Sequence, residues 1–172
     1  MPEKVKPPVV LWVAAMAEVK QPELFLELAE AIPEARFQMM GGAGNSIGFY
    51  HEIKQSASKI SNLEFSGFVP FHEIDEYFKQ ASIFVNTSKI EGFPNTFIQA
   101  WMHYTPVVSL NADPDEIICR YKLGFHSKTS NQLVDDVKIL LRDEQLREEI
   151  TLGEIKRIQV QRRIKVSPQE IN

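Results

Sequence analysis

Residues 87–108 read T-S-K-I-E-G-F-P-N-T-F-I-Q-A-W-M-H-Y-T-P-V-V, and the rest of the chain can be interpreted from them. The carboxylate Glu91 stands at the start of a tight Gly-Phe-Pro-Asn turn. The apolar run 83–86 before it predicts a buried strand, and the apolar spacing after it predicts a helix from Asn95. Residues 83–103 are therefore predicted to form a strand, a polar turn and a helix.

The turn supplies backbone N–H groups at the first turn of the predicted helix. Gly92 lets the backbone approach a ligand closely, and Pro94 has the fixed φ suited to a first helical position. The free amides of Phe93, Asn95 and Thr96 would converge at the helix N-terminus. Such an end favours an anion through its N–H groups and its partial positive charge, and a diphosphate would suit it.

Two polar side chains accompany this helix start. Beside a diphosphate, Glu91 would serve to accept sugar hydroxyls or to stabilise developing positive charge. Gln99 follows eight residues later, about two helical turns or roughly 12 Å along an ideal helix. This separation suits the two ends of an extended nucleotide diphosphate-sugar. The alternatives are a simple acidic helix start for Glu91 and a solvent-facing position for Gln99.

Strands and helices alternate along the chain. The predicted strands are 9–14, 35–40, 63–65, 83–86, 106–110 and 124–126, and the predicted helices are 22–31, 48–60, 73–80, 95–103 and 131–141, with a short acidic helix near 114–121. This alternation predicts an α/β fold, a Rossmann-like parallel sheet with helices on both faces. Ligands of such sheets bind beyond the carboxyl ends of the strands, where the polar turn at Glu91 lies.

Two other loops after strands carry candidate ligand groups. Lys20 follows the first strand and would neutralise a phosphate as a point charge, with an ordinary surface lysine as the alternative. The run G-G-A-G-N-S-I-G at 41–48 includes Gly42 and permits backbone approach to phosphate or base. Its spacing is not G-x-G-x-x-G and it follows the second strand, so a dinucleotide-dependent oxidoreductase is only a distant alternative.

Histidines and acids add no recognisable catalytic motif. The four histidines show no ligand spacing, and no G-x-S-x-G elbow occurs, so we expect neither a catalytic metal nor a serine triad. Asp113, Asp115 and Glu116 follow a predicted strand and either line the ligand cleft or form an acidic helix start.

Charge and composition exclude several classes of protein. The formal charge of −4 gives no overall attraction for nucleic acid. One cysteine and the absence of a signal-like start favour the cytoplasm. We expect residues 1–8 to be a linker, 9–142 the domain and 143–172 a charged helical tail. The tail carries a basic cluster that suits the inner face of a membrane or an acidic partner, with a solvated helical face as the alternative: Lys156, Arg157, Arg162, Arg163 and Lys165.

Residues 9–141 resemble the C-terminal, donor-binding domain of retaining GT-B glycosyltransferases of the group 1 family. The segments that carry the resemblance follow one another in the family's order: W-V-A-A-M-A-E-V-K-Q, P-E-L-F-L-E-L-A, G-G-A-G, L-E-F-S-G-F-V-P, I-F-V-N-T-S-K-I-E-G-F-P-N-T-F-I-Q-A and T-P-V-V. The E-G-F-P-N segment between an apolar strand and T-P-V-V is the specific signal.

The resemblance implies a glycosyltransferase that takes a sugar from a nucleotide diphosphate-sugar with retention and needs no cofactor besides this substrate. It implies that Glu91 contacts the donor sugar near the reacting carbon, that the amides after Gly92 hold the diphosphate, and that Lys20 pairs with its charge. It also implies backbone contact to the base near Val69 and ribose binding at Gln99. A separate N-terminal domain would bind the acceptor, so the isolated domain is expected to bind nucleotide better than it catalyses.

Two departures from the family pattern raise a second hypothesis. The pattern E-x7-E ends here in Gln99, whose amide cannot accept from both ribose hydroxyls as a carboxylate can. Where the family usually has an Arg before the Lys of the first loop, this chain has Ala15, so one diphosphate contact is missing. The alternative is a non-catalytic nucleotide-binding module that kept the fold and lost the chemistry.

Overall fold

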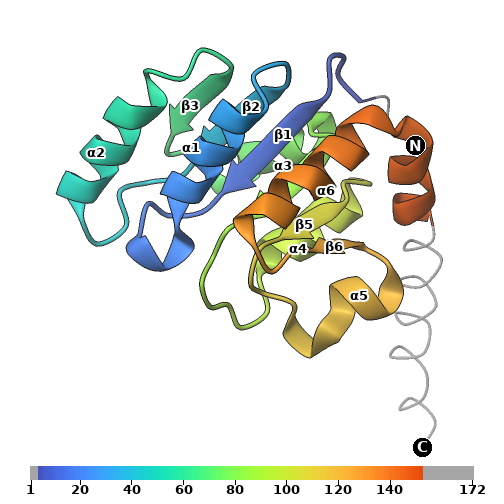
Figure 1. The fold of residues 1–172 in the computed structure, drawn as a ribbon. Coiled ribbons are helices and arrows are strands. Elements are labelled where there is room, and N and C mark those ends of the chain that lie inside the picture. The colour runs from blue at the N-terminus through green and yellow to red at the C-terminus, as the bar shows by residue number, and fades with distance from the viewer. Residues whose placement is uncertain (1–3, 153–172) are drawn as a thin grey trace, which may run out of the picture.

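The fold is a six-stranded parallel sheet in the order β3-β2-β1-β4-β5-β6. The computed structural model describes residues 4–152, and Figure 1 shows the sheet running through the centre of the domain. The strands are β1 (Val9–Val13), β2 (Arg36–Met40), β3 (Leu63–Gly67), β4 (Ile83–Asn86), β5 (Val107–Ser109) and β6 (Gly124–His126). The chain begins in the middle of the sheet, builds one half outward to β3, and returns to the other side of β1.

Helices cover both faces of this sheet, as the alternation predicts. They are α1 (Pro22–Ala31), α2 (Ile47–Ala57), α3 (Phe71–Gln80), α4 (Asn95–Met102), α5 (Ile117–Tyr121) and α6 (Ser130–Arg142), with short 3-10 turns at η1 (Glu18–Lys20) and η2 (Pro114–Glu116). One apolar cluster joins α1, α2 and α6 to one face, and a second joins α3, α4 and α5 to the other. The Rossmann-like fold expected from the sequence is therefore confirmed.

The central strands divide their side chains between these two clusters. In β1, Val10 and Trp12 belong to the cluster with α1, whereas Leu11 belongs to the cluster with α4. In β4, Ile83 is in the first cluster and Phe84 in the second. Because successive side chains of a strand point to opposite faces, a continuous apolar run is what a strand covered on both sides requires.

Most predicted boundaries agree with the structure to within two residues. The helix predicted at 48–60 is shorter, at Ile47–Ala57, and the Ser46 hydroxyl accepts a hydrogen bond from the Phe49 amide at 3.2 Å as its N-terminal cap. Residues 144–152 are helical, whereas the basic cluster of the tail lies outside the described residues. Over residues 4–152, no helix has the length and apolar character needed to cross a bilayer.

Polar side chains tie the connections together at the amino ends of the strands. The Asn62 amide, just before β3, donates to the carbonyls of Ala29 at 3.0 Å, Ile32 at 3.0 Å and Ala35 at 3.1 Å. These carbonyls belong to the end of α1 and the loop that leads into β2. The side chain therefore fastens the first strand–helix unit to the start of β3.

A second tie at this edge involves the first residues that the structure describes. The Lys4 ammonium donates to the carbonyls of Phe78 at 3.2 Å and His103 at 2.6 Å, and to the Thr105 hydroxyl at 2.9 Å. Phe78 lies in α3, and His103 follows the end of α4. Burial lowers the pKa of Lys4 to about 8, so these acceptors hold an ammonium group that is still mostly charged at neutral pH.

Replacing Asn62 by Ala should lower the free energy of unfolding by about 1–3 kcal/mol, because carbonyls at the end of α1 lose their donor. Urea unfolding followed by circular dichroism measures this change. Ser61→Ala, at the exposed neighbouring position, is the matched control and should change the stability by less than about 0.5 kcal/mol. Equal effects of the two substitutions would contradict the role given to the Asn62 amide.

Candidate functional site

The candidate site lies where the order of strands reverses. β1 pairs with β2 on one side and with β4 on the other, so the crossover connections leave β1 in opposite directions. The loops after β1 and β4 therefore diverge at the carboxyl edge of the sheet, which is the place where open α/β sheets bind ligands. Lys20 belongs to the first loop and Glu91 to the second.

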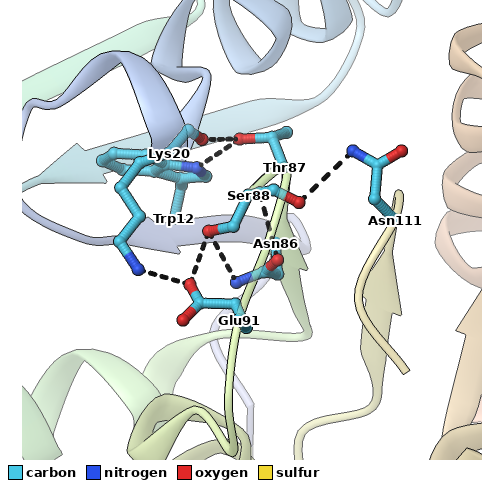
Figure 2. Close-up of polar contacts among 7 residues, drawn as sticks. All are labelled: Trp12, Lys20, Asn86, Thr87, Ser88, Glu91 and Asn111. Carbon is cyan, nitrogen blue, oxygen red and sulfur yellow. Dashed lines mark hydrogen bonds and ion pairs between the residues drawn. The ribbon is translucent and has the colours of Figure 1, made fainter. Parts of the chain in front are cut away.

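These two residues form an ion pair. The Lys20 ammonium lies 2.5 Å from Oε1 of Glu91, although 71 residues separate them in sequence. The Ser88 hydroxyl donates to the same oxygen at 2.6 Å, as Figure 2 shows. Both hydrogen bonds reach Oε1 and neither uses Oε2. The structure thus brings together the two charged residues that the sequence analysis singled out separately.

The Glu91 side chain is mostly enclosed, with 14% of its surface exposed, and Lys20 retains 26%. Burial alone would raise the pKa of Glu91, but the hydrogen bonds from Lys20 and Ser88 outweigh it and hold the pKa below its usual value. The carboxylate is therefore ionised at neutral pH.

Thr87 holds the loop that carries Lys20 against the end of β4. Its hydroxyl donates to the Lys20 carbonyl at 2.7 Å and accepts from the indole N–H of Trp12 in β1 at 2.9 Å. The Lys89 amide adds a backbone bond to the Val19 carbonyl at 2.8 Å. Figure 2 shows the Thr87 hydroxyl joined by dashed lines to both Trp12 and Lys20. These bonds fix the lysine backbone, so that only its side chain has to be placed by Glu91.

A second set of bonds joins the loop after β5 to the same place. The Asn86 carbonyl oxygen Oδ1 accepts from the Ser88 amide at 3.1 Å, and the Asn111 side chain donates to the Ser88 carbonyl at 3.3 Å. Ser88 is almost fully buried. Ser88 is therefore held by Asn86 at the end of β4 and by Asn111 after β5, and its hydroxyl is placed to hydrogen-bond Glu91 (Figure 2).

The turn after Glu91 leads into α4, whose first residue is Asn95. The helix start predicted at Asn95 is confirmed, and Pro94 is the N-cap residue, without a side-chain cap hydrogen bond. A Cβ at Gly92 would meet no other atom within 4 Å. Phe93 is exposed and Thr96 half-buried. The helix start is consequently open on the side of Gly92.

Within the run 41–48, the backbone requires glycine at Gly41, whereas the sequence analysis selected Gly42. A Cβ on Gly41 would lie 1.6 Å from the carbonyl oxygen of Ala14, whereas a Cβ on Gly42 would come no closer than 3.4 Å, to the ring of Phe68. The Gly42 carbonyl accepts a hydrogen bond from the Met16 amide at 2.8 Å. The run therefore brings the loop after β2 against the loop after β1, with Gly42 beside the Lys20 loop.

Val69 and Gln99 lie outside the hydrogen-bonded pair of Lys20 and Glu91. The Val69 side chain is buried in the apolar cluster under α3 and α4, which leaves only its backbone for a ligand. Gln99 is half-buried on α4, and its backbone carbonyl accepts from the His103 amide at 3.2 Å. Their roles in binding a base and a ribose stay predictions.

Sequence reasoning overlooked the polar side chains that support the pair. Asn86, Thr87 and Ser88 are all nearly inaccessible to solvent. The signal was present as three consecutive polar residues directly after an apolar strand, because polar groups that are buried at a strand end need hydrogen-bond partners. Asp113 does not line this site: its carboxylate accepts from the amide of Ile118 at 2.7 Å, at the start of α5. Of the two interpretations given for Asp113, a cleft residue or an acid at a helix start, the structure supports the second.

Comparison with solved structures places the fold among glycosyltransferases. The C-terminal domain of a glycosyl transferase group 1 family protein (LpcC) from Francisella tularensis is 20% identical, with a TM-score of 0.74 over 89% of this chain and 85% of that chain. Sucrose-phosphate synthase from Thermosynechococcus elongatus is 19% identical, with a TM-score of 0.78 over 90% of this chain and 41% of that chain. TarM from S. aureus is 19% identical, with a TM-score of 0.74 over 91% of this chain and 34% of that chain.

Comparison of sequences gives two further results. A stretch of 28 residues is 93% identical to part of the chaperone SurA of Shewanella sp. (strain MR-4), but it covers 16% of this chain and 6% of the chaperone, too little of either to define a family. The sequence model of the family named Glycosyl transferases group 1 matches residues 2–156, which include every residue of the candidate site. The chain therefore belongs to the glycosyl transferases group 1 family.

Proposed function

We propose that the chain is the donor-binding domain of a glycosyltransferase that moves a sugar from a nucleotide diphosphate-sugar to an acceptor with retention of configuration. The observation that carries the proposal is the ion pair between Lys20 and Glu91 across the loops on either side of the strand-order reversal. It provides a cation for phosphate and a carboxylate for sugar in one place. Retention rests on the resemblance to the family.

Lys20 suits the diphosphate because an ammonium group has three N–H donors, and Glu91 takes one of them. The two remaining donors are available to phosphate oxygens without loss of the ion pair. The ammonium group then lies between two anionic groups, and its charge offsets the repulsion between the Glu91 carboxylate and the diphosphate.

The N-terminus of α4 supplies the second contact to the diphosphate. Pro94 has no N–H, so the amides at this end belong to Phe93, Asn95 and Thr96. The open space at Gly92 allows a phosphate to approach them. The positive end of the helix dipole adds a favourable interaction with the anion.

Glu91 is the residue proposed to act on the sugar. Because Lys20 and Ser88 both bind Oε1, Oε2 is the oxygen that accepts a hydrogen bond from a sugar hydroxyl. As an ionised carboxylate near the reacting carbon it also stabilises positive charge that develops on the sugar in the transition state. In this proposal, backbone groups near Val69 and Gly42 bind the base, and Gln99 binds the ribose.

Neighbouring structures support a nucleotide as the ligand class. The TarM structure from S. aureus is a complex that includes UDP, and the pneumococcal O-GlcNAc transferase GtfA was solved with UDP and GlcNAc. The identities of these proteins to the chain are 19% and 14%, so they support the class of ligand and not the base or the sugar.

The proposal includes a second domain that binds the acceptor. The chain spans 34% of TarM and 41% of sucrose-phosphate synthase, less than half of either protein. Closure between two domains excludes water and completes a transferase site. The isolated chain is accordingly proposed to bind the donor without efficient turnover, in the cytoplasm, where the basic tail suits contact with the inner membrane face.

The second candidate is a nucleotide-binding module that has lost transferase chemistry. Ala15 lies exposed on the loop after β1, and its methyl side chain offers no charge to a phosphate. Gln99 stands where the family pattern has a carboxylate. Each of these two differences is expected to lower the affinity for the donor. This candidate keeps the ligand of the first and differs from it in turnover.

Calorimetric titration of the chain with UDP, GDP, ADP and their sugars should show saturable binding of one base class. Lys20→Ala should weaken that binding about tenfold, because a hydrogen bond to a charged partner is lost. Lys89→Ala, at an exposed lysine two residues from Glu91, is the control and should bind like the unaltered chain. If none of the ligands binds, or if NAD binds in preference to them, the proposed ligand class is wrong.

Glu91→Gln should separate sugar recognition from nucleotide recognition. The affinity for the nucleotide-sugar should fall about tenfold, since the charged acceptor for a sugar hydroxyl is lost. The affinity for the nucleoside diphosphate alone should stay the same or rise, because a negative charge beside the phosphates is removed. A parallel loss for both ligands would place Glu91 outside the sugar subsite and make its role structural.

The double substitution Ala15→Arg with Gln99→Glu discriminates between the two candidates. Restoring a fork of N–H donors for phosphate and a carboxylate for ribose should raise nucleotide affinity at least about tenfold in a degenerate module. An unchanged affinity in the same titration indicates a working variant that binds its donor by other groups. Circular dichroism of the double variant serves as the control for folding.

A further inference from the structure

A second cluster of reactive side chains lies at the carboxyl ends of β5 and β6, beyond the pair of Lys20 and Glu91. Asp113 follows β5, Cys119 lies in α5 and His126 ends β6. One carboxylate oxygen, the thiol sulfur and one ring nitrogen all lie within 4.8 Å of one another. Within residues 4–152 this is the one group of three or more His, Cys, Asp or Glu side chains that meets that condition.

The two ring nitrogens of the histidine have different neighbours. Nε2 of His126 lies 3.2 Å from the carbonyl oxygen of Asn111, and because a carbonyl can only accept, Nε2 carries the proton. In the neutral ring Nδ1 is then the acceptor. Nδ1 lies 3.8 Å from Oδ2 of Asp113, too far for a hydrogen bond and close to the separation of two ligands of one metal ion.

Asp113 is fixed in a position to serve as a ligand. Only 3% of its side chain is exposed. Its two oxygens accept from the amides of Ile118 at 2.7 Å and Cys119 at 3.3 Å. A carboxylate has about four lone-pair positions, so the two amide bonds and the hydrogen bond with the Cys119 thiol orient the group and still leave a position for a cation. Burial and the neighbouring Asp113 raise the pKa of the Cys119 thiol, which is therefore protonated until a metal displaces its proton.

We propose that Oδ2 of Asp113, Sγ of Cys119 and Nδ1 of His126 bind a Zn²⁺ ion, with water as the fourth ligand. Zinc accepts sulfur, nitrogen and oxygen ligands together and prefers a tetrahedron. In such a tetrahedron ligand atoms are about 3.3–3.7 Å apart, so the present separations need only small side-chain rotations. The thiol loses its proton to solvent on binding, and no atom is oxidised or reduced.

The surroundings of His126 match those of a metal ligand. Histidines that bind metals usually donate their other N–H to a carboxylate or a backbone carbonyl, which fixes the ring and raises its basicity. The bond from Nε2 to Asn111 is of this kind. The Cys119 thiol is hydrogen-bonded with the Asp113 carboxylate, so a metal ion here would take the place of the thiol proton between two groups that are already in contact.

Zinc at this place would be coupled to the neighbouring site. The backbone of Asn111 holds His126, and its side chain donates to the carbonyl of Ser88 at 3.3 Å and to Oε1 of Gln21 at 3.3 Å. The ion would therefore fix the loop that supports the Ser88 hydroxyl against Glu91. The zinc site does not depend on the proposed glycosyl transfer, because no nucleotide takes part in it.

Titration of the 172-residue chain with Zn²⁺, after treatment with a chelator, should give one ion per chain in calorimetry. Cys119→Ser and His126→Ala should each lower the affinity by at least about tenfold, since each removes a ligand. His51→Ala removes an exposed histidine that lies outside the cluster, and it should leave the affinity unchanged. Circular dichroism checks that all variants fold alike.

Cobalt(II) provides a second measurement that a nonspecific surface site would not satisfy. Because Cys119 is the single cysteine of the chain, a thiolate-to-cobalt charge-transfer band must arise from it. The band should appear with the unaltered chain and with His51→Ala, and should be absent from Cys119→Ser. The proposal fails if no such band forms, if His51→Ala weakens zinc as much as His126→Ala does, or if half an ion binds per chain as the protein dimerises.

Discussion

Parallel pairing of β1 with β4 is the constraint on which the rest of the structure depends. It reverses the order of strands at the centre of the sheet, and this reversal sets the loops that follow the two strands side by side. Lys20 and Glu91 meet for this reason alone, since the chain between them runs out to β3 and back. The hydrogen bonds of Thr87 then convert neighbouring loops into a fixed arrangement.

Much of the fold follows from patterns that are local in sequence. The run at 83–86 is apolar at every position but the last, as a strand buried on both faces must be, and the structure has β4 at Ile83–Asn86. The same holds for α1, where Pro22 opens a helix that buries Phe25 and Leu28. Alternation of such units, together with the rule for carboxyl ends of strands, suffices to place Lys20 and Glu91 on one edge of the sheet.

Features that depend on a contact between distant backbones could not be predicted in this way. The requirement for glycine at Gly41 comes from the carbonyl of Ala14, and no spacing within the glycine run reveals it. Asp113 and His126 come together because β5 and β6 pair in register, from Val107 with Gly124 to Ser109 with His126. Their separation in sequence matches no ligand motif, which is why the histidines looked unrelated to one another and to the cysteine.

The two ends of the strands have different tasks in this domain. At the amino ends, Asn62 and Lys4 fasten helix ends and loops through backbone carbonyls. At the carboxyl ends, side chains such as those of Lys20 and Glu91 face one another. Substitutions at the second edge leave the fastenings at the first untouched, so the domain can change the molecules that it recognises at little expense in folding. Because Asn62 stabilises the fold at the amino ends, residues at the carboxyl ends can be exchanged for new binding functions while this contribution to stability stays in place.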